Sequence, residues 1–157
     1  MNPDVIRSFS FHCDPLTHRV SVMDADGRIV IEFGGFGRQP GAFDTPIDAT
    51  LVMPEFFGES DHATEPWLAV ADYGNRRVQV FELDGALVGV IDEEILGAAA
   101  GAPCRLVWRD PVLEVEGVDG GRSRLHLGAA LLSNEIEPAL PSATFAAHVP
   151  RSYRELN

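Results

Sequence analysis

Residues 70–81 read VADYGNRRVQVF, and this stretch decides the fold that the sequence predicts. Val78 and Val80 alternate with polar neighbours, which is the period of a β-strand with one buried face. Asp84-Gly85 follows, and this pair favours a tight hairpin turn because it tolerates positive φ angles. Residues 86–91 read ALVGVI and supply a further apolar strand. The segment is therefore predicted to form an antiparallel β-meander.

The same pattern occurs earlier in the chain at a constant offset of 58 residues. HRVSVMDADG at residues 18–27 aligns with RRVQVFELDG at residues 76–85, and Asp14 falls opposite Asp72 without a gap. Repeated supersecondary units are typical of propellers and solenoids, in which stacked neighbours bury faces that one unit cannot bury alone. The chain is therefore predicted to contain at least two similar blades.

A third, degraded copy is predicted after residue 103. Its strands are expected at residues 104–108, 112–115 and 123–127, with Asp119-Gly120-Gly121 as the turn between the last two. Residues 93–98 between the second and third copies form either a short helical turn or a plain crossover. Residues 144–149 either complete a blade as its last strand or belong to a tail.

These motifs resemble the NHL repeat. The blade of that family carries a VAD-x-GN-x-R-[VI]-Q-V-F stretch, which residues 70–81 match almost completely, and a glycine-rich crossover, which FGGFGRQPGAFDTP at residues 33–46 matches in the expected place. The first copy departs from the family because Pro15-Leu16-Thr17 replaces the loop Tyr73-Gly74-Asn75. The resemblance implies an all-β fold of β-propeller blades, each a four-stranded antiparallel meander.

The length allows about three NHL-type blades, in residues 1–132, with residues 133–157 as a C-terminal tail or closing strand. A propeller ring has about 4–8 blades, so three blades are half of a six-bladed ring. We expect a second copy to close the ring as a homodimer, the commonest symmetric oligomer. The alternative is a compact three-blade monomer with the C-terminal segment folded over the open face.

The composition limits the classes of partner and compartment. The 24 acidic and 12 basic residues give a net charge of −12, a field that repels nucleic acid. The N-terminus lacks the basic and apolar regions of a secretory signal, and there is no apolar run of about 18 residues to cross a membrane. Cys13 and Cys104 form no metal-binding pattern. These features predict a cytoplasmic protein.

The most individual feature is an insert at residues 54–66, where the family has a tight turn. Phe56, Phe57, His62 and the adjoining Trp67 make it the candidate binding loop, because aromatic loops on a rigid scaffold are common recognition devices. The alternative is that Phe56 and Phe57 cap the open end of the blades or seal a dimer junction. The sequence does not choose between these two roles.

The polar residues of the repeat motif are Asp72, Asn75, Arg76 and Arg77. We expect them to be structural, because aspartate and asparagine bond to turn amides, while arginine pairs with a carboxylate or covers apolar surface.

No catalytic, cofactor-binding or metal-binding residue is predicted. The glycines at residues 34–37 are followed by Pro40 where a nucleotide-binding loop would carry its third glycine. His12 and Asp14 share a strand face and suit a transition metal, but His18 lies beyond a turn. Cys13 and Cys104 lack a paired histidine, so no nucleophile is indicated.

Two functions are carried forward from these features. The first is a non-enzymatic NHL-type module that self-associates and presents loops to a protein or small ligand, the role that the resemblance implies. The second is a hydrolase or lyase, with or without a metal, whose site lies in the central channel of the propeller.

Overall fold

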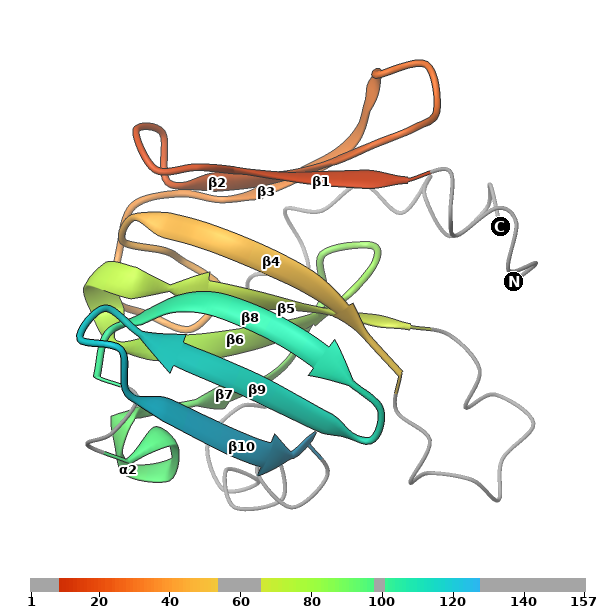
Figure 1. The fold of residues 1–157 in the computed structure, drawn as a ribbon. Helices are drawn as coiled ribbons and strands as arrows, with labels where there is room; N and C mark the ends of the chain where they lie inside the picture. Colours follow the sequence, from red (N-terminus) through yellow and green to blue (C-terminus); the bar gives the residue numbers. More distant parts are fainter. Residues whose placement is uncertain (1–8, 54–65, 98–100, 128–157) are drawn as a thin grey trace.

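The computed structural model describes residues 9–53, 66–97 and 101–127, and it is an all-β fold of three antiparallel sheets (Figure 1). Sheet 1 contains β1 (Ser10–Asp14), β2 (Arg19–Met23) and β3 (Ile29–Gly34). Sheet 2 contains β4 (Pro46–Val52), β5 (Trp67–Asp72), β6 (Arg77–Glu82) and β7 (Leu87–Ile91). Sheet 3 contains β8 (Pro103–Arg109), β9 (Val112–Gly117) and β10 (Arg122–His126). In every sheet the neighbouring strands follow the order of the chain, so each sheet is a meander. The expected strands of all three copies are confirmed.

The two Asp-Gly turns use the glycine alone for the positive φ angle. Gly27 has φ 78° and Gly85 has φ 88°, whereas the preceding aspartates keep negative φ. The N–H of each glycine donates to the carbonyl three residues earlier, at Asp24 and Glu82. This geometry is a type I turn followed by a left-handed residue, and it places an irregularity in the strand pairing beside the turn.

The chain between β7 and β8 forms the short helix α2 (Glu93–Leu96), so the helical turn is the correct one of the two alternatives for this region. Asp92 begins the helix, because its Oδ1 accepts a hydrogen bond from the N–H of Ile95 at 3.1 Å. No helix in the described part of the chain is long and apolar enough to cross a membrane.

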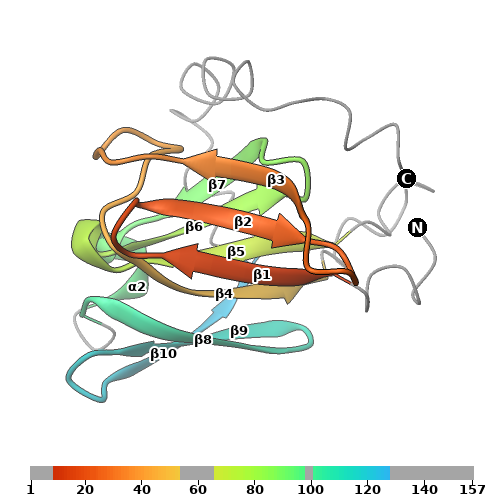
Figure 2. The ribbon, with the colours of Figure 1, turned by 90° about the horizontal axis from the view of Figure 1, so that it is seen from above.

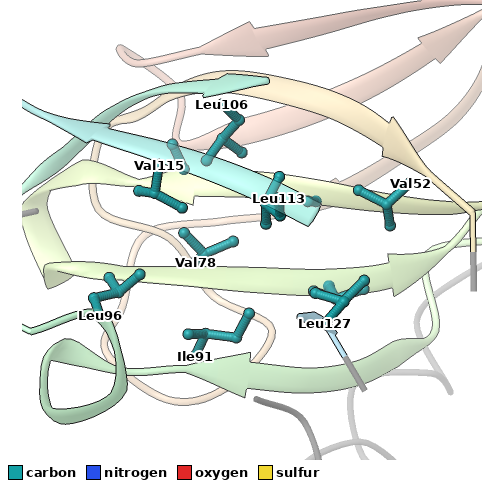
Figure 3. Packing of buried hydrophobic residues seen from close by; sticks show 11 residues of the cluster. Val52, Val78, Ile91, Leu96, Leu106, Leu113, Val115 and Leu127 are labelled. Atoms are coloured by element: carbon teal, nitrogen blue, oxygen red, sulfur yellow. The ribbon is translucent and has the colours of Figure 1, made fainter. Parts of the chain in front are cut away.

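Sheet 2 lies between the other two sheets and is covered on both faces (Figures 1 and 2). Val20, Val22 and Phe33 of sheet 1 pack against Leu68 and Phe81 of sheet 2. On its other face, sheet 2 packs against sheet 3 in a second cluster (Figure 3). This cluster contains Val52, Val78, Val80, Ile91, Leu106, Leu113 and Val115. Double burial explains why β5 is apolar except for Asp72, and why every residue of β6 except Glu82 is buried.

The sequence repeat is also a structural repeat. Strands β2 and β6 begin 58 residues apart, at Arg19 and Arg77, and β3 and β7 begin at Ile29 and Leu87 with the same offset. Between sheets 2 and 3 the offset of the second strands is shorter. Strand β9 begins at Val112, which is 45 residues after the start of β5. There Asp110-Pro111 is the whole connection, in place of residues 53–66 of sheet 2.

The first strands of sheets 2 and 3 lie against each other. Asp48 on β4 accepts a hydrogen bond from the N–H of Leu106 on β8 at 2.7 Å, so the two strands are joined directly. Residues 144–149, the candidate last strand, lie outside the described residues, as does the whole segment 133–157.

Candidate functional site

The carboxylate of Asp72 is the centre of a buried polar cluster in sheet 2. Its Oδ2 accepts from Arg77 Nε at 2.7 Å, from Asn75 Nδ2 at 3.0 Å and from Gln79 Nε2 at 3.1 Å. Its Oδ1 accepts from the N–H of Asp44 at 2.8 Å. Asp72 and Gln79 are completely buried, so this charge is paired and hydrogen-bonded as a buried charge must be.

The same side chains hold the connection between sheets 1 and 2. Arg77 donates to three backbone carbonyls, while Gln79 both donates to the connection and accepts from it. Asn75 donates to a fourth carbonyl at 2.9 Å. The backbone partners are Gly37, Arg38, Gln39, Gly41 and Ala42. We call Asp72, Asn75, Arg77 and Gln79 the junction cluster, because these residues fix the path of the chain from one sheet to the next.

The junction cluster extends to the turn between β5 and β6. The N–H of Gly74, in the 3-10 turn η2 (Tyr73–Asn75), donates to the carbonyl of Asp44 at 2.8 Å. A Cβ atom at this glycine would meet the backbone and side chain of Asp44, so only glycine allows the close approach. Arg76 stands apart from the cluster, with Nη2 3.1 Å from Glu93 of α2 at the surface.

The candidate binding loop lies mostly outside the described residues. This applies to Phe56, Phe57 and His62. Trp67 is the first residue of β5, where it is half-buried and packs against the cluster between sheets 2 and 3. Trp67, the one of these four residues that the structure describes, therefore takes part in the packing between sheets 2 and 3.

The candidate metal ligands of sheet 1 are not brought together. His12 is exposed opposite Ser21, and Asp14 accepts from the N–H groups of Leu16 and Thr17 in its own turn. His18 accepts from the N–H of Thr45 through Nδ1 at 2.9 Å, so this nitrogen is occupied by the connection. Among the described residues, no group of three or more histidine, cysteine, aspartate or glutamate side chains is placed to hold a metal.

Both cysteines are free thiols, and each is partly buried. Cys13 packs against the cluster between sheets 1 and 2, where burial, together with the charge of Asp48, raises its pKa to about 12. A thiol with such a pKa is almost entirely protonated at neutral pH, and it is therefore a poor nucleophile.

The outer face of sheet 3 is a second candidate site, which the sequence reasoning missed. Six of its side chains are charged, and they alternate along each strand with the residues that face sheet 2. Val107, Val112 and His126 lie on the same outer face. We call Arg105, Arg109, Glu114, Glu116, Arg122 and Arg124 the arginine face. The signal is present in the sequence as CRLVWR, LEVE and RSRLH. The chain is acidic, and all twelve of its basic residues are arginine. Four of these twelve lie in the two short stretches CRLVWR and RSRLH.

One of the two carboxylates on the arginine face is shared between two arginines, and the other pairs with one. Glu114 lies 3.1 Å from Arg109 and 3.5 Å from Arg124, whereas Glu116 lies 3.9 Å from Arg122. The hollow between these residues is about 80 Å³. A small-molecule site usually has about 300–1,000 Å³, so the hollow has room for a side-chain carboxylate and not for a whole ligand.

Neither the protein-family models nor the curated proteins give a match to this chain. The class is therefore defined by the fold and the sites alone. It is an all-β stack of three antiparallel meanders with a buried polar junction and an arginine-bearing end face.

Proposed function

We propose that the chain is a non-enzymatic interaction module built from three NHL-type propeller blades. Three observations support the blade assignment: the meander order of each sheet, the face-to-face stacking, and the direct contact between the first strands of sheets 2 and 3. The second and third strands of sheets 2 and 3 begin 45 residues apart, which agrees with a propeller repeat of about 40–45 residues. The first strands, β4 and β8, begin 57 residues apart, because the connection at residues 53–66 lengthens sheet 2.

The observation that carries the functional proposal is the junction cluster. Asp72, Arg77 and Gln79 are the buried polar side chains of the repeat motif, and their hydrogen bonds go to one another and to the chain between two blades. Such groups are committed to holding the scaffold. The surfaces left for recognition are the loops and the two end faces of the stack.

The outer faces of sheets 1 and 3 bear on whether a second copy closes a six-bladed ring. The outer face of sheet 1 is polar, with Arg19 2.8 Å from Glu32 and Ser21 donating to the same glutamate. The outer face of sheet 3 carries the arginine face. Terminal units of stacked repeats have polar outer faces that keep the stack finite. The two end faces therefore favour the three-blade monomer over the dimer.

Elemental analysis of the purified full-length chain, combined with multi-angle light scattering, tests the proposal. We expect no stoichiometric metal and a mass near 17.0 kDa. Twice that mass would support closure of the ring by a second copy. One equivalent of tightly bound metal would contradict the non-enzymatic proposal and favour a metal-dependent hydrolase or lyase.

A further inference from the structure

We propose that the arginine face binds an acidic peptide segment of a partner protein in an extended conformation. This inference rests on the proposed function, because it names the partner of an interaction module. It begins from the charge of the outer face of sheet 3, where four arginines face two glutamates and leave an excess of two positive charges. The chain as a whole has a net charge of −12, so this excess is local and opposite in sign.

The arginines of this face have unused hydrogen-bonding capacity. Each guanidinium carries five N–H donors and matches the two oxygens of a carboxylate. Arg105 lies opposite Glu116 in the strand register, but within the described residues it has no ion pair. Glu116 is also only loosely paired with Arg122, at 3.9 Å. The paired arginines remain accessible, with side chains 68–73% exposed.

The geometry of the face fits an extended chain. Arg122 and Arg124 are two residues apart on β10, as are Glu114 and Glu116 on β9. Alternate side chains of a strand lie about 7 Å apart on one face. An extended peptide with a carboxylate at every second position has the same spacing. The hollow is lined by three arginines, Arg105, Arg109 and Arg122, and by the two glutamates, so a carboxylate that enters it meets an excess of one positive charge.

A protein segment fits this face better than a nucleic acid does. The average field of the acidic chain repels a dense polyanion, whereas a short peptide brings only as many negative charges as the face can neutralise. Binding of single-stranded nucleic acid also uses aromatic side chains on which the bases stack. None of the six residues of the arginine face is aromatic, and among the described residues on the same side of sheet 3 only His126, at the end of β10, carries an aromatic ring.

Fluorescence anisotropy of the full-length chain tests the inference. The probe is a short fluorescein-labelled peptide of alternating glutamate and serine, with a glutamine-for-glutamate peptide and an oligothymidylate of similar length as comparisons. We expect only the glutamate peptide to bind in low salt, and its affinity to fall as salt screens the charges. The double variant Arg105→Gln/Arg122→Gln should bind it about tenfold more weakly, because two exposed ion pairs are lost.

The double variant Arg19→Gln/Arg28→Gln is the matched control, because it removes the same charge near sheet 1 and should leave the affinity unchanged. Equal weakening in both double variants, or no binding of the glutamate peptide, would overturn the inference. Tighter binding of the oligothymidylate would replace the acidic peptide by a nucleic acid. None of these results changes the metal content or the native mass, so the interaction module is tested separately.

Discussion

Sheets 2 and 3 have the same strand pairing and opposite chemistry at equivalent positions. In sheet 2, Ala69 pairs with Val80 and Ala71 pairs with Val78. In sheet 3, the corresponding pairs are Glu114 with Arg124 and Glu116 with Arg122. The alanines and valines of sheet 2 are completely buried against sheet 3. The glutamates and arginines of sheet 3 lie on its outer face, away from sheet 2.

This difference separates the outer face of sheet 3, the last sheet in the described residues, from a face that another sheet covers. The backbone pairing is the same in both sheets, so the side chains on the outer face alone decide whether another sheet can pack there. An apolar face must be covered, and a face of paired charges is stable in water. Sheet 3 keeps Leu113 and Val115 toward sheet 2 and carries charges on its other side.

The largest effect is expected when an arginine is placed in sheet 2 at Val78, the position equivalent to Arg122 of sheet 3. Val78→Arg buries an unpaired charge between sheets 2 and 3, and we expect a loss of more than about 4 kcal/mol in the free energy of unfolding, measured by urea denaturation. The reverse change, Arg122→Val, alters an exposed side chain and should cost less than about 0.5 kcal/mol. If the two variants unfolded at the same urea concentration, the assignment of the two faces would be wrong.

A second contrast, between sheets 1 and 2, separates two aspartates of the repeat. Asp72→Ala leaves Arg77 buried without its carboxylate, and we expect a loss of about 3–5 kcal/mol in urea denaturation. Asp14→Ala removes only hydrogen bonds within a surface turn, so its effect should be much smaller. Equal losses would show that the junction cluster does not join the sheets.

The control at Asp14 also has a defined pH dependence. Hydrogen bonds from the backbone of Leu16, and then from Thr17, lower the pKa of this carboxyl. The stabilisation that Asp14 gives is therefore present above the pKa of the unfolded chain, and it is lost as the pH falls through the lower pKa of the folded chain. Wild type and Asp14→Ala should become equally stable at acid pH.

The strands and the repeat were predictable from the sequence, because alternation and Asp-Gly turns are local signals. Val78 and Val80 indicated a strand, and Gly85 indicated the turn that follows. The structural role expected for Asp72 and Arg77 followed from residue type. Their partners were not predictable, because the backbone of residues 37–42 lies more than thirty positions away in the chain.

The arginine face could not be recognised as an end face before the fold was known. The alternation of RSRLH shows that Arg122 and Arg124 share a face, but it does not show which face meets sheet 2. That depends on the packing of Leu113 and Val115, which is a tertiary property. The same limit applied to His18, whose bond to Thr45 joins two segments that are distant in the sequence.

The last test changes no packing contact and concerns the covered face of sheet 1, where Cys13 packs against sheet 2. With a pKa of about 12, the thiol of Cys13 is ionised in about one molecule in ten thousand at pH 8. In the variant Cys104→Ser, which leaves Cys13 as the one thiol of the chain, we expect iodoacetamide to alkylate it about a thousandfold more slowly than a thiol of pKa 9.0. The rate should rise about tenfold with each pH unit, because the thiolate is the nucleophile.

The same shift adds stability that is complete below pH 9.0 and is lost as the pH rises toward 12, because only the unfolded thiol ionises easily in that window. Mass spectrometry of the alkylated chain over a pH series measures the rate. A rate that levels off near pH 9 would show an exposed thiol. Sheet 2 would then not cover this face of sheet 1, and the contrast between covered and outer faces would fail at that position.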